Sequence, residues 1–186
     1  GAFYGPKIDL HIKDALGRTW QCGTIQLDMS LPERFNLYYI EKDNEKHRPI
    51  MIHRTVFGSI ERFLGILIEH FAGKFPLWMA PVQAVILPIN DDLVPYSNEV
   101  ENILKSAGLR AEVDSRTESL NKKVREAQLQ YIPLILTIGG KEKEAGTLSV
   151  RTLDGNVKYG VSHQAFLDTV LAHIRNRELS LDIFSG

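Results

Sequence analysis

Cysteine is almost absent from this sequence, as are long apolar runs and an excess of charge of either sign. Cys22 is the single cysteine among 186 residues, which excludes an internal disulfide and a cysteine-rich zinc knuckle. No apolar stretch approaches the roughly 18 residues of a membrane span, and no signal-like segment opens the chain, so we expect no membrane partner. Scarce cysteine also fits a protein of the reducing cytoplasm.

The net charge limits what kind of nucleic-acid binding is open to the chain. A formal net charge of −1 excludes a chain-wide basic surface, so any such contact must be a local patch. With 44% hydrophobic and 24% charged residues, the composition is that of an ordinary globular protein with one large domain or two small ones. The chain begins at Gly1 and reads straight into strand-like sequence, so we expect a piece of a longer protein.

The first half of the chain has the pattern of an antiparallel sheet. Polar and apolar residues alternate in Lys7–Lys13 and again in Gln21–Met29, which predicts two half-buried strands. Pro49–Phe57 reads as a third strand, and the charged run Glu41–Arg48 as a solvated excursion before it. With the helix that follows, this order predicts an antiparallel sheet with a helix on one face.

That helix is the most periodic element of the sequence. It begins after Gly58 and Ser59, and its apolar residues recur with helical spacing, which predicts one continuous buried stripe. The residues of the stripe are Ile60, Phe63, Leu64, Leu67, Ile68 and Phe71. The following segment, Ala72–Pro81, is rich in glycine and proline, and we expect two domains, 1–78 and 79–186.

The second half alternates strands and helices. Strands are predicted at Val82–Leu87, Ala111–Val113, Ile132–Ile138 and Thr147–Thr152. Three helices are predicted. The first has Asn98 and Glu101 in capping-box spacing, Ile103 and Leu104 facing inward, and Gly108 as its stop, and the second covers Ser119–Gln130. The third is capped by Ser162, and its apolar face consists of Phe166, Leu167, Val170, Leu171 and Ile174. Short connections between these elements predict an α/β fold with a mixed, mainly parallel sheet.

Four segments, in order, carry a resemblance to a known family: Phe3–Asp9, Trp20–Asp28, Met51–Arg54 and Gly58–Phe63. They resemble the last third of the catalytic domain of the threonyl class II aminoacyl-tRNA synthetases, and Gly58–Phe63 resembles motif 3. The second half resembles the α/β anticodon-binding domain that threonyl, prolyl, histidyl and some glycyl enzymes share. The resemblance implies a threonine–tRNA ligase whose partners are threonine, ATP with Mg²⁺, and tRNA(Thr).

The resemblance implies six substrate-facing residues: Lys7, Gln21, Thr24, Gln26, Ser59 and Arg62. It implies that the Arg62 guanidinium stacks on the adenine of ATP, for which a planar, permanently charged group is suited. Gln21 and Thr24 would contact the nucleotide, and Gln26 would help hold threonine. The residues alone also fit a plainer interpretation, a solvated arginine and the outward polar face of a half-buried strand.

His53 lies in the third predicted strand, where a histidine is commonly a hydrogen-bonded structural residue. The resemblance implies instead that it is one of three protein ligands of a catalytic zinc, whose open positions take the amino group and hydroxyl of threonine. By family position the other two ligands, a cysteine and a histidine, do not lie in this chain. We therefore interpret Cys22 as a packed structural thiol.

In the second half the resemblance implies an anticodon-binding surface of five residues: Arg116, Thr117, Arg125, Glu142 and Arg151. Reading unpaired bases needs groups that form paired hydrogen bonds, and Glu142 and Arg151 would supply them. Lys122, Lys123 and Arg125 on one helix would suit phosphates. The mild local excess of basic residues is equally typical of a solvated face.

Nothing in the sequence resembles motif 1 or motif 2. We therefore expect the parent enzyme to be a homodimer, and this chain alone to be monomeric and catalytically incompetent. Three alternatives are a stand-alone anticodon-binding module without ligase activity, a prolyl or histidyl relative, and an interaction protein built on the α/β domain. The block Gln21–Asp28 argues against the second, and the presence of Gln26, His53 and Arg62 argues against the third.

Overall fold

The structure is a computed structural model that describes residues 3–180 and 183–184. The chain divides into two compact units, Gly1–Ala72 and Gly73–Gly186. The division lies earlier than the expected boundary after residue 78, because Leu77 is fully buried in the core of the second unit. Among the described residues, no helix combines the length and the apolar character needed to cross a bilayer.

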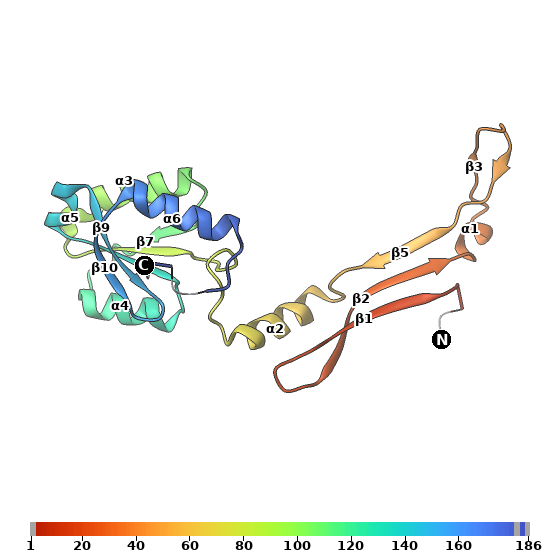
Figure 1. Ribbon diagram of the computed structural model, residues 1–186, viewed down its shortest axis with the longest axis horizontal. Helices are drawn as coiled ribbons and strands as arrows, with labels where there is room; N and C mark the ends of the chain where they lie inside the picture. Colours follow the sequence, from red (N-terminus) through yellow and green to blue (C-terminus); the bar gives the residue numbers. More distant parts are fainter. Residues whose placement is uncertain (1–2, 181–182, 185–186) are drawn as a thin grey trace. The chain divides into compact units, whose positions relative to one another are not determined.

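The first unit contains the expected antiparallel sheet. Its strands β1 (Lys7–Lys13), β2 (Thr19–Asp28) and β5 (Met51–Thr55) are arranged in the order β1-β2-β5 (Figure 1). Lys7 pairs with Gln26, and Gln26 pairs in turn with His53. Because directly paired residues point to the same face, these three side chains form one row across the sheet.

Between β2 and β5 the structure contains elements that the sequence did not predict. A short helix, α1 (Leu31–Arg34), has a proline in its first turn, and the strands β3 (Tyr39–Ile40) and β4 (Lys46–His47) form a small hairpin. The residues of this hairpin are mostly exposed, as expected of a solvated excursion. Two-residue strands are too short to give a period-2 signal, so the hairpin went unrecognised.

Helix α2 (Ile60–Phe71) begins where expected, with Ser59 as its N-cap accepting a hydrogen bond from the Arg62 N–H. The prediction of a buried stripe along it was wrong: Ile60 is 71% and Leu64 49% exposed, and Ile66 is the one buried residue of the helix. Periodicity identifies the face that is suited to burial, but within the described part of the first unit no other element covers that face.

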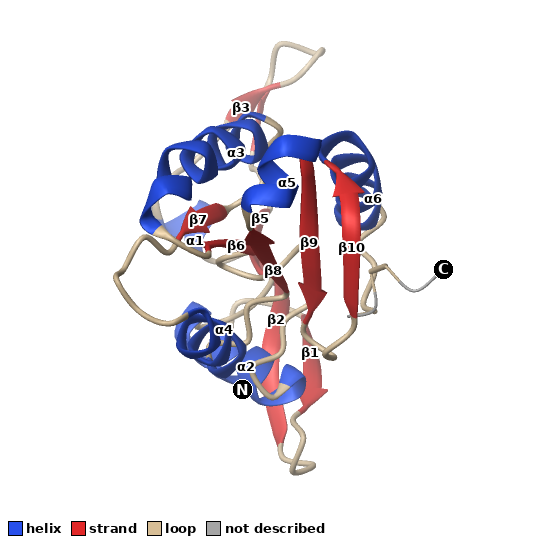
Figure 2. Ribbon diagram, turned by 90° about the vertical axis from the view of Figure 1, so that its left-hand side faces the viewer, coloured by secondary structure: helices blue, strands red, loops and turns tan. Residues whose placement is uncertain are grey.

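The second unit is built on a five-stranded mixed sheet in the order β10-β9-β8-β6-β7. Its strands are β6 (Ala84–Pro88), β7 (Ala111–Val113), β8 (Leu134–Ile138), β9 (Thr147–Thr152) and β10 (Val157–Ser162). Strand β6 pairs in parallel with β7 and β8, whereas β8–β9 and β9–β10 are antiparallel (Figure 2). The sheet is mixed, as predicted, but parallel pairing does not dominate it, because the unpredicted strand β10 adds a hairpin.

Helices cover both faces of this sheet. They are α3 (Val94–Ser106), preceded by the 3₁₀ turn η1 (Asp91–Leu93), then α4 (Leu120–Leu129), α5 (Gly140–Ala145) and α6 (His163–Arg175). Helices α3 and α6 lie on one face and α4 on the other (Figure 1). The larger core lies under α3 and α6 and includes Phe166 and Val170, and a smaller core under α4 includes Ile135 and Ala127. Ser162 caps α6 as predicted, and Ser119, the first residue of the helix predicted over Ser119–Gln130, is the N-cap of α4.

The predicted capping box of α3 was wrong. The helix begins at Val94 with a proline in its first turn, so Asn98 lies inside it, and Glu101 instead pairs with Lys105 at 2.9 Å. Leu104 is buried as expected, but Ile103 is 44% exposed. Proline is a favoured residue in the first helical turn, and that signal outweighs the spacing of Asn98 and Glu101.

Candidate functional site

The polar face of the β1-β2-β5 sheet collects five of the seven residues predicted at the substrate or the zinc. Lys7, Gln26 and His53 form the row described above, and Thr24 lies on the same face because it pairs with Asp9 next to that row. Gln21 reaches this face through a β-bulge between Leu10 and His11 that shifts the register. The alternation of β2 therefore brings these side chains together, as the sequence predicted for a polar strand face.

Asp9, which sequence reasoning missed, joins three of these residues. Its carboxylate accepts hydrogen bonds from Gln21 Nε2 at 2.7 Å and Thr24 Oγ1 at 2.8 Å, and lies 3.1 Å from Lys7 Nζ. Burial would raise the pKa of Asp9, but the hydrogen bonds from Thr24 and Lys7 and the charge of Lys7 outweigh it and hold the pKa below its usual range. A carboxylate only accepts, so the Gln21 amide nitrogen faces Asp9 and its oxygen is left to accept from a ligand.

His53 is held by a second carboxylate, Asp28, at the end of β2. Nε2 of His53 lies 2.8 Å from Oδ2 of Asp28, whose side chain is fully buried, while the His53 side chain is 45% exposed. Burial would raise the pKa of Asp28, but backbone N–H donors at Leu31 and Ser30 and the contact with His53 lower it. Beside His53 in the row, Nε2 of Gln26 is buried and has no hydrogen-bond partner among the residues that the structure describes.

The start of α2 carries the other two predicted substrate residues. Ser59 Oγ accepts from the Arg62 N–H at 3.4 Å and donates to Glu61 Oε2 at 2.7 Å, so its hydroxyl already makes two hydrogen bonds. The Arg62 side chain is exposed, and its guanidinium carbon lies 5.8 Å from the centre of the Trp20 ring. This arginine is therefore positioned next to an aromatic plane and is free of ion pairs in the described part of the chain.

In the second unit Arg116 forms a network of its own. Its guanidinium contacts Asp114 at 2.6 Å and Glu126 at 2.8 Å, and these hydrogen bonds and charges raise its pKa. Arg116, Thr117 and Lys123 also line a hollow of about 350 Å³ beyond the end of β6. The carboxyl end of parallel strands is the usual ligand-binding edge of an α/β sheet.

The predicted phosphate contact at Lys123 was wrong. Lys123 is buried, and its ammonium donates to the backbone oxygen of Asp114 at 2.9 Å. It lies on the inward side of α4 with the buried Ala127, where its long stem packs and its ammonium meets a carbonyl. Lys122 pairs with Glu118 at 2.5 Å, and Arg125 is exposed without an ion pair among the described residues.

Glu142 and Arg151 come from neighbouring elements, α5 and β9. Glu142 accepts from the Gly139 N–H at 3.0 Å and from Ser149 Oγ at 2.9 Å, and although burial raises its pKa, the Ser149 hydrogen bond and its other partners lower it below the usual range. Arg151 lies two residues after Ser149, on the same side of β9, and donates to the Gly155 oxygen at 3.3 Å. One hydrogen bond leaves the other guanidinium donors of Arg151 to a ligand.

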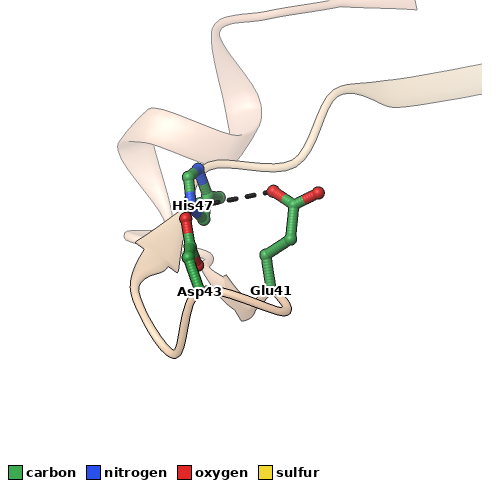
Figure 3. A group of neighbouring side chains, drawn as sticks. All are labelled: Glu41, Asp43 and His47. Atoms are coloured by element: carbon green, nitrogen blue, oxygen red, sulfur yellow. Dashed lines mark hydrogen bonds and ion pairs between the residues drawn. The ribbon is translucent and has the colours of Figure 1, made fainter.

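The β3–β4 hairpin holds a further group that the sequence did not suggest: Glu41, Asp43 and His47 (Figure 3). It is the one set of three potential metal ligands gathered together within the described residues. His47 Nε2 lies 2.7 Å from Asp43 and 3.6 Å from Glu41, and Asp43 also accepts from the Glu45 N–H. These contacts close the exposed turn and account for the group without an ion.

Cys22 is buried with a free thiol, as expected for a packed structural residue. Among the described residues, neither Cys22 nor His53 belongs to a group of three potential metal ligands.

Two family models match the chain, one on each unit. The tRNA synthetase class II core domain (G, H, P, S and T) matches residues 1–71, and the anticodon binding domain matches residues 83–173. A threonine–tRNA ligase of Desulforapulum autotrophicum is 72% identical over 98% of this chain and 29% of the relative, and one of Clostridioides difficile is 54% identical over 96% and 28%. The chain thus spans less than a third of the length of these curated relatives.

A solved structure is similar across both units. It is the crystal structure of the RNA binding domain of threonyl-tRNA synthetase from Cryptosporidium parvum Iowa II, with a TM-score of 0.79 and 38% identity. The match covers 93% of this chain and 44% of that one.

Proposed function

Since this chain belongs to the threonyl group of the class II aminoacyl-tRNA synthetases, we propose that it is part of a threonine–tRNA ligase and that its second unit recognises the anticodon of tRNA(Thr). The whole enzyme would activate threonine with ATP and transfer it to the 3′ end of the tRNA. The observation that carries this proposal is the coincidence of two family matches with two structural units, residues 1–71 with the first and 83–173 with the second.

The first unit would contribute one wall of the site where the threonine carboxylate attacks the α-phosphorus of ATP. Arg62 would stack on the adenine and offset phosphate charge, and Gln21 would accept a hydrogen bond through the amide oxygen that Asp9 leaves free. Lys7 would hold negative charge of the substrates, and Gln26, with its unpartnered Nε2, would donate to threonine. Mg²⁺ would enter with ATP and spread the charge on the transferring group.

His53 fits a metal ligand by its chemistry: the imidazole is exposed, and its Nδ1 has no partner among the described residues. Bound zinc would supply a Lewis acid that selects threonine through its amino group and hydroxyl, and two further ligands would come from outside this chain. By itself the chain should therefore not activate threonine, and threonine-dependent pyrophosphate exchange by the 186-residue chain would contradict this.

We propose that the complete enzyme is a homodimer of the cytoplasm, and that this chain alone is a monomer because nothing in it resembles motif 1. A concentration-independent dimer in sedimentation experiments would contradict the second part. A stand-alone anticodon-binding module is the alternative function. The exposed apolar face of α2, which no described element of the first unit covers, favours the ligase instead, because such a face fits a surface that packs against further parts of a larger enzyme.

In the second unit, Glu142 and Arg151 would read base edges in the unstacked anticodon, and Arg125 would contact a phosphate. Arg116 and Thr117 line the hollow at the end of β6 and would border the same loop. Because Arg116 is already paired with two carboxylates, its role would be to shape the surface rather than to donate to a base. Arg151 makes a single hydrogen bond and is the better candidate for direct reading.

Arg151→Ala and Arg125→Ala separate these two roles. Losing a base-reading pair costs about 1–3 kcal/mol of discrimination, so Arg151→Ala should lower the preference for the threonine anticodon stem-loop over a non-cognate one. Arg125→Ala should weaken both stem-loops alike and reduce the dependence of binding on salt. Filter binding at two salt concentrations measures both effects. An unchanged cognate to non-cognate ratio in Arg151→Ala would assign base reading to other residues.

A further inference from the structure

The fully buried Asp28 has two separate tasks, one for each carboxylate oxygen. Oδ1 accepts from the backbone N–H groups of Ser30 and Leu31, both at 2.9 Å, and so shapes the turn from β2 into α1. Oδ2 lies 2.8 Å from Nε2 of His53. The first task serves the fold, but the turn needs only one oxygen. The second contact fixes the orientation of a half-exposed imidazole on the neighbouring strand.

The chemistry of this pair decides which nitrogen of His53 carries the hydrogen. An ionised carboxylate is only an acceptor, so Nε2 must donate, and in the neutral imidazole Nδ1 then holds a free lone pair. Gln26 lies next to His53 in the row, and its buried Nε2 has no hydrogen-bond partner among the described residues. Gln26 therefore does not donate a hydrogen bond to Nδ1 of His53, and the lone pair of Nδ1 stays available.

We propose that Asp28 is a positioning residue that locks His53 in the Nε2–H tautomer and thereby presents Nδ1 as the metal-binding nitrogen. That Nδ1 binds a metal rests on the function proposed above, whereas the tautomer assignment of His53 does not. A histidine ligand commonly donates its second ring N–H to a carboxylate, which orients the ring and raises its basicity. The cross-strand contact between Asp28 and His53 has the donor and acceptor that such an arrangement requires.

The isosteric variant Asp28→Asn tests the lock without removing the turn. The asparagine oxygen can still accept from Ser30 and Leu31, but its NH₂ group then faces His53 and can only donate. Nε2 must become the acceptor, and the hydrogen moves to Nδ1. We therefore expect the main tautomer of His53 to reverse from Nε2–H to Nδ1–H.

The measurement is the pair of ring ¹⁵N chemical shifts of His53 in the 186-residue chain, at a pH where the imidazole is neutral. The unmodified protein should be mainly Nε2–H, and this first result needs no variant to fold. A protein that is mainly Nδ1–H, or an Asp28→Asn variant that folds and keeps the Nε2–H form, overturns the inference.

The hairpin offers a matched control, because Asp43 contacts Nε2 of His47 at 2.7 Å in the same way. Asp43→Asn should change the tautomer balance of His47 and leave that of His53 untouched. It should also leave metal binding at His53 unchanged, since this pair lies in the exposed turn between β3 and β4 (Figure 3).

Metal binding by Nδ1 is tested in the full-length protein, where zinc affinity is measured by competition with a chromophoric chelator. Asp28→Asn should weaken zinc binding about 10- to 100-fold, and Asp43→Asn should not change it. Equal affinity in Asp28→Asn and the unmodified protein overturns the positioning role. If the unmodified protein binds no zinc at all, the proposed metal site fails, while the ring shifts still decide whether Asp28 sets the tautomer.

Discussion

Replacing Gln83 with methionine should destabilise the second unit without changing its shape. Gln83 is 1% exposed, its Oε1 accepts from the Arg110 N–H at 2.9 Å, and its Nε2 donates to the Leu77 oxygen at 2.9 Å. These two hydrogen bonds connect the segment at Leu77 with Arg110, the residue before strand β7. Methionine has a similar volume, so the cavity contribution is small and the loss comes from hydrogen bonding.

The size of the effect follows from the two groups left behind. The Leu77 carbonyl belongs to a fully buried residue, and leaving it unsatisfied costs about 1–3 kcal/mol. The Arg110 N–H is partly exposed and costs about 1 kcal/mol. Gln83→Met should therefore lower the free energy of unfolding of the second unit by about 2–4 kcal/mol.

Urea unfolding followed by tryptophan fluorescence measures this change. The chain has two tryptophans, Trp20 in the first unit and Trp78 in the second, so a Trp20→Phe background reports on the second unit alone. Gln130→Met at the exposed end of α4 is the control and should change stability by less than about 0.5 kcal/mol. If Gln83→Met costs no more than this control, the hydrogen-bonded role of Gln83 is refuted.

Two further predictions concern the pH dependence of the first unit and the smaller core of the second. Burial would raise the pKa of Asp14, but hydrogen bonds from Trp20 and Arg18 lower it from 3.8 to about 2. The ionised Asp14 carboxylate therefore stabilises the folded first unit above its unfolded pKa, and this stabilisation is lost as the pH falls from about 4 to 2. Trp20 fluorescence should follow this loss, and an Asp14→Asn variant with the same acid transition would contradict it. Ile135→Ala should cost the second unit about 2–5 kcal/mol in the Trp78 assay, whereas Leu129→Ala, at a 68% exposed position, should be nearly neutral.

Much of the second unit could be predicted because its sequence signals are local. The strand at Thr147–Thr152 and the cap at Ser162 lie where the pattern put them, since a buried run and a serine before an apolar periodic stretch need no distant partner. Strand β10 could not be predicted: Gly160 has a φ of 66° and Tyr159 is 75% exposed, so the alternation is broken. An edge strand with a bulge gives little signal in one sequence.

The candidate site was predictable where it follows from alternation and from family resemblance, and hidden where it depends on register. Lys7, Gln26 and His53 share a face because β1, β2 and β5 alternate regularly. The role of Asp28 was hidden because its partner His53 is 25 residues away in sequence and is met across a strand pair. The sequence also gave no sign that Lys123 turns inward, since a basic residue on a helix is normally exposed.

Recognition of the threonine anticodon by the second unit can be measured in one binding comparison. The 186-residue chain is titrated by fluorescence anisotropy against the anticodon stem-loop of tRNA(Thr) and against the same stem-loop with one anticodon base changed, at a single salt concentration. A discrimination of 1–3 kcal/mol for a base-reading contact predicts an affinity ratio of about 5- to 150-fold in favour of the cognate loop. Equal affinity for the two stem-loops would contradict the claim.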